Sequence, residues 1–80
     1  MTTVNVLYFA SLRDASGVAS ERVESEAADL QALYAELRSR HGFALPMNRL
    51  RVAADGEFAK WSDALSEGCE IAFIPPVSGG

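Results

Sequence analysis

The spacing of apolar and polar positions divides this chain into predicted strands and one main helix. Residues 3–9 are β-branched, aromatic and almost continuously apolar, which is typical of a strand buried on both faces. Residues 19–24 alternate in polarity and carry several charges, as an exposed edge strand does. Residues 50–54 and 70–74 predict two further strands. Between them, Asp55 and Gly56 predict a tight turn that returns the chain through a short strand or extended segment at residues 57–61.

The clearest predicted element is an amphipathic helix that begins after Asp29 and ends at Gly42. Asp29 is a favourable N-cap residue and Gly42 a favourable C-cap residue. Glu36 and Arg40 are spaced as an i,i+4 ion pair on the solvent side. We interpret His41, the only histidine, as a cation at the helix end rather than a catalytic base. One helical face is apolar and consists of Leu30, Leu33, Tyr34 and Leu37.

The order of these elements predicts an α+β fold. Residues 10–17 are expected to form a single helical turn that places Leu12 under the sheet and stops at Gly17. Because one long helix cannot cover both faces of a sheet, we expect a mixed sheet with that helix across one face and the first and last strands central. This arrangement is a β-grasp, in which the last strand lies parallel to the first. We assign residues 1–75 to this domain and residues 76–80 to a flexible tail.

Composition and charge narrow the classes of function. The chain has 80 residues, enough for one small core but not for a deep active site of its own. Its net charge of −4 argues against nucleic-acid binding and favours a protein partner with basic patches. No apolar run is long enough to cross a membrane, and one cysteine is typical of a cytoplasmic protein. The sequence shows no metal-ligand spacing, phosphate-binding loop or catalytic triad.

The last residues predict a thin, exposed end. Pro75 and Pro76 remove two backbone donors, so the last strand should stop at residue 74. Gly79 and Gly80 have no Cβ, so the terminal peptide could enter a narrow channel with its carboxylate sterically open. Pro76, Val77, Ser78 and Gly79 are therefore the candidate segment for a partner's active site, and Gly80 carries the candidate reacting group.

Two stretches of the sequence carry a family resemblance. The residues from Gly68 to Gly80, above all the last nine, resemble the C-terminal signature of molybdopterin synthase small subunits, a family of ubiquitin-like sulfur carriers. The sequence Tyr8-Phe9-Ala10, followed by Arg13 and Gly17, resembles that family's first strand and turn. The match covers the whole chain. One difference is Cys69, which stands where the family usually has a carboxylate.

The resemblance implies a specific chemistry for Gly80 in molybdenum cofactor biosynthesis. An E1-like activating enzyme would use ATP to adenylate the terminal carboxylate, and a sulfur donor protein would then displace AMP. The resulting thiocarboxylate would give its sulfur to a pterin precursor inside the large subunit, with which the family forms a heterotetramer. This chain would bind no cofactor and would not be catalytic by itself, because the large subunit supplies the acid–base groups.

Three alternative functions stay open from the sequence. The chain could carry sulfur for another pathway, such as thiamine thiazole synthesis or tRNA thiolation. It could be a ubiquitin-like protein modifier, because an activated terminal glycine also serves isopeptide formation. It could also be a plain interaction module with a frayed end.

For each candidate residue outside the tail, a structural role competes with a functional one. We interpret Cys69 as an inert, small hydrophobic residue rather than a sulfur relay. Phe58 and Trp61 could form a partner patch, but we interpret them as aromatic residues that complete the core. The candidate partner surface consists of Phe9, Phe73 and Pro75, which could also fill the core.

Overall fold

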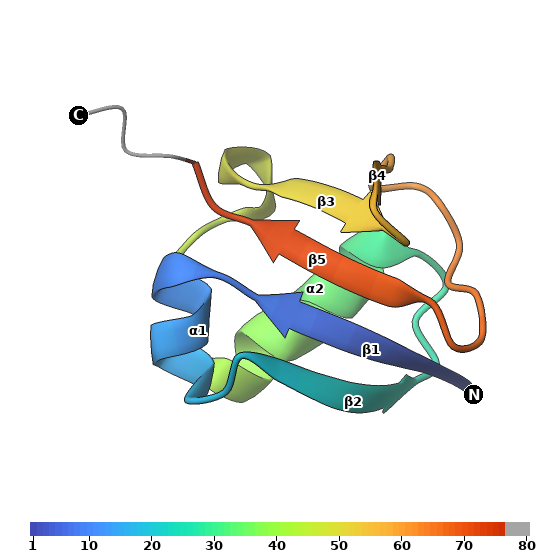
Figure 1. Ribbon diagram of the computed structural model, residues 1–80, viewed down its shortest axis with the longest axis horizontal. Helices are drawn as coiled ribbons and strands as arrows, with labels where there is room; N and C mark the ends of the chain where they lie inside the picture. The colour runs from blue at the N-terminus through green and yellow to red at the C-terminus, as the bar shows by residue number, and fades with distance from the viewer. Residues whose placement is uncertain (77–80) are drawn as a thin grey trace.

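A mixed sheet forms the framework of the domain. The computed structural model describes residues 1–76. The strands are β1 (Thr2–Tyr8), β2 (Ser20–Ser25), β3 (Arg51–Ala54), β4 (Glu57–Phe58) and β5 (Glu70–Ile74). They lie in the order β2-β1-β5-β3-β4, with β1 parallel to β5 and the other pairs antiparallel (Figure 1). The predicted α+β fold, with β1 and β5 side by side inside a mixed sheet, is confirmed.

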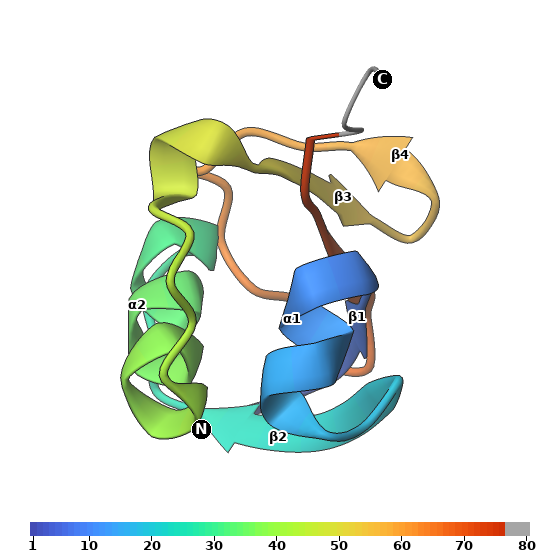
Figure 2. The same cartoon turned by 90° about the vertical axis from the view of Figure 1, so that its left-hand side faces the viewer.

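The main helix, α2 (Leu30–His41), covers one face of the sheet. Figure 2 shows α2 on one side of the strands. The Asp29 carboxylate accepts a hydrogen bond of 2.9 Å from the Ala32 N–H, which caps the helix start. Gly42 ends the helix in the left-handed conformation at φ 72°, and its N–H donates to the Arg38 carbonyl. Leu30, Leu33, Tyr34 and Leu37 are all buried, so the predicted apolar face is confirmed.

A second, shorter helix lies between β1 and β2. The prediction of a single helical turn was wrong, because α1 (Ala10–Ser16) has seven residues. Its second turn is closed by Gly17, whose N–H donates to the Arg13 carbonyl at 2.9 Å while the residue adopts φ 81°. Leu12 is buried as predicted, so α1 seals the end of the core at which β1 finishes.

The sheet has one buried face and one open face. Strand β1 was predicted to be buried on both faces, and this was wrong, because Asn5 is exposed and Leu7 only half-buried. Val4, Val6 and Tyr8 alternate with them and are buried under α2. Since α2 covers only one face, the outward-pointing side chains of β1 and β5 are left accessible to a partner.

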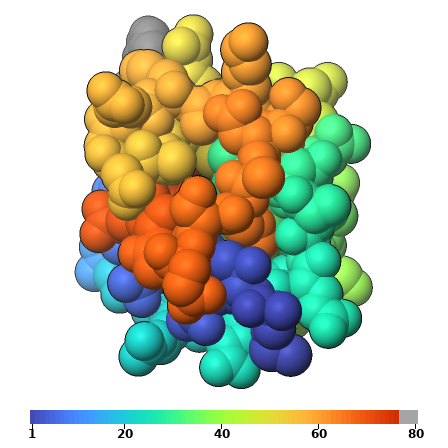
Figure 3. All heavy atoms as spheres, turned by 90° about the vertical axis from the view of Figure 1, so that its right-hand side faces the viewer, coloured from blue at the N-terminus to red at the C-terminus, as the bar shows by residue number. Residues whose placement is uncertain are grey.

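The segment between β4 and β5 closes the far end of the core. Strand β4 is shorter than the predicted residues 57–61, and the chain then crosses toward the start of α2, where Leu30 N–H donates to Asp63 and Gln31 N–H to Trp61, both at 3.0 Å. Figure 3 shows this segment in orange between the strands and α2. Trp61 packs against the core and stacks on Phe73 with ring centroids 5.9 Å apart. The prediction for Trp61 is therefore confirmed.

Candidate functional site

Strand β5 carries the chain from the middle of the sheet to the start of the tail. It pairs with β1 on one side and with β3 on the other, where Ile74 lies opposite Arg51. Pro75 and Pro76 follow and stay at the protein surface, half-buried and exposed respectively. Of the predicted tail, residues 76–80, only Pro76 is described, and Val77, Ser78, Gly79 and Gly80 lie outside the described residues. The structure thus gives the tail a base held by hydrogen bonds on both sides.

An accessible apolar surface surrounds this base on the open face of the sheet. Phe9 is 45% exposed and Phe58 70% exposed, and the outward side chains of β1 and β5 lie near them. Two shallow pockets of about 250 and 610 Å³ hollow this surface, and Phe9 and Ile74 line both. We define the root face as Leu7, Phe9, Phe58, Ala72, Ile74 and Pro75.

One predicted member of the partner surface is placed in the core instead. Phe9 and Pro75 lie on the root face, but Phe73 is 0% exposed and packs under α2. The reason is strand alternation: Phe73 points the same way as Ile71, so Ala72 and Ile74 point outward. In the sequence of β5, the large apolar Ile71 and Phe73 share one face and Glu70 and Ala72 share the other, and this alternation is the signal that could have placed Phe73 in the core.

Phe58 was predicted to complete the core, and the structure contradicts this. It lies on the two-residue edge strand β4, just after the turn at Asp55 and Gly56. Both residues of β4 are exposed, because no element within residues 1–76 covers that edge. Phe58 therefore extends the root face toward β3.

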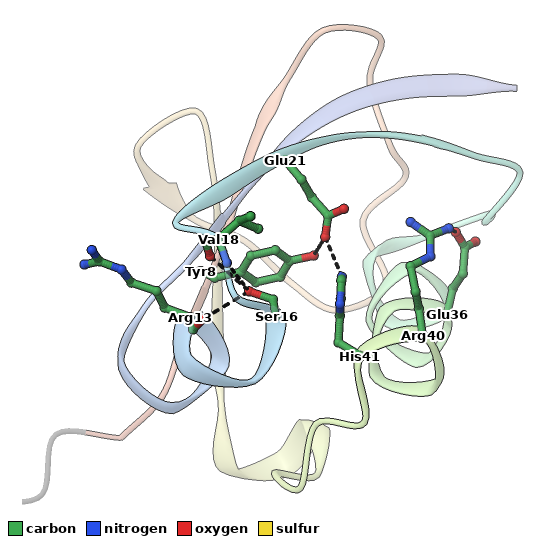
Figure 4. Close-up of polar contacts among 8 residues, drawn as sticks. All are labelled: Tyr8, Arg13, Ser16, Val18, Glu21, Glu36, Arg40 and His41. Atoms are coloured by element: carbon green, nitrogen blue, oxygen red, sulfur yellow. Dashed lines mark hydrogen bonds and ion pairs between the residues drawn. The ribbon is translucent and has the colours of Figure 1, made fainter.

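A polar cluster joins β1, β2 and the C-terminal end of α2. Tyr8 on β1 donates a hydrogen bond to Glu21 on β2, and the same carboxylate oxygen lies 2.6 Å from His41 Nε2 (Figure 4). The sequence indicates no carboxylate near His41 at the end of α2, and the structure supplies one in Glu21. The two residues are 20 positions apart, so no local spacing could reveal the pair.

Burial and hydrogen bonding shift the ionisation of this cluster. Burial acts to raise the pKa of Glu21, but hydrogen bonds from Tyr8 and His41, with the charges of His41 and Arg40, outweigh it and lower the pKa. Burial also raises the pKa of Tyr8 far above its ordinary value, and Glu21 adds to this rise. Tyr8 consequently stays a neutral donor. The cluster is structural, because it fixes the end of β1 that precedes the root face.

We expect Glu21→Ala to lower the free energy of unfolding by about 1.5–3 kcal/mol near neutral pH, since two donors lose a charged acceptor. The folded-state pKa of Glu21 lies below its unfolded value, so its contribution is present above the unfolded pKa and is lost as pH falls through the folded pKa. Urea unfolding at about pH 7 and about pH 3 measures this loss. Glu24→Ala, an exposed change on the same strand, is the control and should cost less than about 0.5 kcal/mol. A Glu21 effect that is equal at both pH values would contradict the assignment.

The remaining chemically notable residue is Cys69. Its side chain is buried and belongs to the hydrophobic core, which agrees with its interpretation as a small hydrophobic residue. Its backbone joins the turn before β5 to β1, because the Cys69 carbonyl accepts from Asn5 N–H at 2.9 Å. Among residues 1–76, no three His, Cys, Asp or Glu side chains gather into a metal site, and no helix could span a membrane.

Comparison with known proteins identifies the family. Residues 6–80 match the model of the ThiS family. The chain is 41% identical over 83 residues to the molybdopterin synthase sulfur carrier subunit of Homo sapiens, an alignment that covers 96% of this chain and 93% of the relative.

Two solved structures show the same fold. Small archaeal modifier protein 1 from Haloferax volcanii superposes with a TM-score of 0.80 at 27% identity, covering 98% of this chain and 99% of that one. Subunit 1 of the molybdopterin-converting factor of Helicobacter pylori, solved in a complex of subunits 1 and 2, gives a TM-score of 0.68 at 24% identity, covering 99% and 100%. The chain belongs to the ThiS family and, within it, to the molybdopterin synthase sulfur carrier subunits.

Proposed function

We propose that this chain is the sulfur carrier subunit of a molybdopterin synthase and that the carboxylate of Gly80 carries the sulfur. The observation that supports this most directly is the position of β5. It is paired on both sides and delivers Pro75 and Pro76 to an exposed apolar face. A partner can therefore bind the folded domain beside β5 while the last four residues enter its active site.

The proposed chemistry has three transfers. A carboxylate oxygen of Gly80 attacks the α-phosphorus of ATP in an E1-like activating enzyme, and pyrophosphate leaves. The terminal sulfur of a persulfide on a donor protein then attacks the acyl carbon and displaces AMP, which gives an acyl disulfide. A thiol attacks the donor's sulfur in this disulfide, so the thiocarboxylate is released and the donor and the thiol are left joined as a disulfide. Finally the thiocarboxylate sulfur attacks an electrophilic carbon of the pterin precursor in the large subunit and displaces a leaving group from it. Hydrolysis of the acyl–sulfur bond then leaves the sulfur on the precursor as a thiol and returns the carboxylate of Gly80. The chain itself binds no cofactor in this scheme.

The root face is the proposed docking surface for both enzymes. Each must hold the same tail, so each must contact the body where the tail begins. The relative in Homo sapiens is named as a subunit, and the Helicobacter pylori chain was solved with its subunit 2. We therefore propose a large-subunit partner. From the family resemblance we also propose a heterotetrameric synthase and a cytoplasmic reaction.

Mass spectrometry after reconstitution tests the proposed function. Incubated with its activating enzyme, ATP and a sulfur source, the chain should gain the mass of one oxygen-to-sulfur exchange, and fragmentation should place the change on Gly80. A Cys69→Ala variant is the control and should gain the same mass, because Cys69 is buried away from solvent. A mass change that sits on Cys69 would contradict the carboxylate mechanism.

A protein modifier is the second candidate, supported by the likeness to the archaeal modifier protein. Activation of Gly80 would be shared, but the acyl group would pass to a lysine amine and form an isopeptide bond. Affinity purification of the chain separates the two functions. A carrier should be recovered in a non-covalent complex with its large subunit, whereas a modifier should be recovered joined by isopeptide bonds to other proteins.

A further inference from the structure

A cleft with two arginines opens beside the start of the tail. It has a volume of about 380 Å³, and its lining includes Arg49, Arg51, Phe58, Ile74, Pro75 and Pro76. Arg49 ends the 3₁₀ helix Met47–Arg49, and Arg51 begins β3 opposite Ile74. We call this site the arginine cleft. It shares Phe58, Ile74 and Pro75 with the root face, so a protein that covers one also covers the other.

The charge of the cleft is opposite to that of the whole chain. The chain carries a net charge of −4, but the residues among 1–76 that line the cleft include two arginines and no carboxylate. Within residues 1–76, the ion pairs are Arg40 with Glu36 and His41 with Glu21, and neither involves Arg49 or Arg51. Both side chains are exposed, so their guanidinium groups are free of carboxylate partners from the described part of the chain.

Arg51 is also held in a defined position. Its guanidinium carbon lies 5.4 Å from the centroid of the Phe58 ring, a cation–π distance. The Phe58 ring contacts the guanidinium on one side only, so the N–H groups of Arg51 that point elsewhere are able to donate to a carboxylate in bidentate geometry. Arginine at this position therefore supplies a directed recognition group as well as a positive charge.

We propose that the arginine cleft binds an acidic segment of the protein that receives the tail, with its carboxylates on Arg49 and Arg51. The inference rests on the proposed function and adds to it a second, polar contact beside the apolar root face. Two neighbouring cations that have no carboxylate partner within residues 1–76 suit carboxylates. The apolar walls formed by Phe58 and Ile74 suit the backbone and short side chains between those carboxylates. The overall negative charge disfavours an extended polyanion such as RNA. The net charge alone had suggested a basic partner surface, and this cleft reverses that expectation locally.

Zero-length crosslinking to the large subunit tests the contact. Arg51→Lys places an amine in the cleft, and a carbodiimide joins an amine only to a carboxylate that touches it. Lys60, the only lysine, is first changed to arginine so that it gives no background. Arg22→Lys is the matched control, because Arg22 is exposed on β2, at the opposite edge of the sheet. We expect a crosslink from position 51 to an Asp or Glu of the large subunit and none from position 22.

Binding constants provide the second measurement. The double variant Arg49→Glu with Arg51→Glu should weaken the complex at least tenfold at low salt and remove most of its salt dependence, whereas Arg22→Glu should change the Kd less than twofold. Thermal melts establish that each variant is folded. A complex that forms without a crosslink from position 51, or a double variant that binds like the Arg22 control, overturns the inference alone. A wild-type chain that does not bind the large subunit overturns the proposed function and this inference together.

Discussion

Deleting Gly79 and Gly80 should abolish sulfur transfer while shifting the melting temperature by less than about 3 °C. The buried core described here runs from Val4 to Phe73, and the strand pairings end at Ile74. The deletion removes no member of either set, so the free energy of unfolding should hardly change. It removes the carboxylate that the proposed reaction uses, so transfer to the pterin precursor should fall below detection. A coupled assay for the pterin product and a thermal melt measure the two effects.

Two variants that keep the full length of the tail distinguish a defect at the reacting glycine from the effect of shortening the tail. Ser78→Ala keeps the terminal carboxylate and both glycines and should transfer sulfur at close to the normal rate. Gly80→Ala keeps the carboxylate but adds a methyl group at the reacting end, so we expect a large loss of rate with unchanged stability. Sulfur transfer that survives deletion of both glycines, or a large fall in melting temperature, would contradict the assignment of the tail.

The elements with strong local signals were predicted closely from the sequence. Helix α2 begins after Asp29 and ends at Gly42, because a capping carboxylate and a left-handed glycine determine both ends locally. Strand β5 runs from Glu70 to Ile74 as predicted, and Pro75 cannot donate a further ladder hydrogen bond. The mixed sheet followed from the element order and from the single long helix.

The features that sequence reasoning missed depend on contacts between distant residues. An apolar run such as that in β1 does not show whether one face or both will be covered, and α2 covers only one. The partner of His41 is Glu21 on β2, 20 positions earlier in the chain. The arginine cleft combines η1 (Met47–Arg49), β3, β4 and β5, so its charge is visible only after folding. The sequence placed the candidate partner surface beside the tail, but it did not show which neighbouring side chains point outward.

Phe73 and Ile74 are adjacent in β5, and substitutions at the two positions should have opposite consequences. Phe73 is 0% exposed, and its ring centroid lies 5.1 Å from that of Tyr34 and 5.9 Å from that of Trp61. Phe73→Ala should therefore cost about 3–5 kcal/mol. Since a chain of this length has a free energy of unfolding of roughly 4–12 kcal/mol, much of the protein could unfold at physiological temperature.

Ile74→Ala should leave the fold stable but weaken partner binding. Its side chain is half-buried on the root face, so truncation should cost about 1 kcal/mol or less of folding free energy. The same truncation removes an apolar anchor where the body meets the tail, and we expect the Kd for the large subunit to rise at least tenfold. Urea unfolding and isothermal titration calorimetry on both variants measure the two effects, with Val18→Ala, an exposed change away from the root face, as the control. The opposite order, with Phe73→Ala stable but defective in binding and Ile74→Ala unstable but binding normally, would show that the outward face of β5 has been assigned the wrong way round.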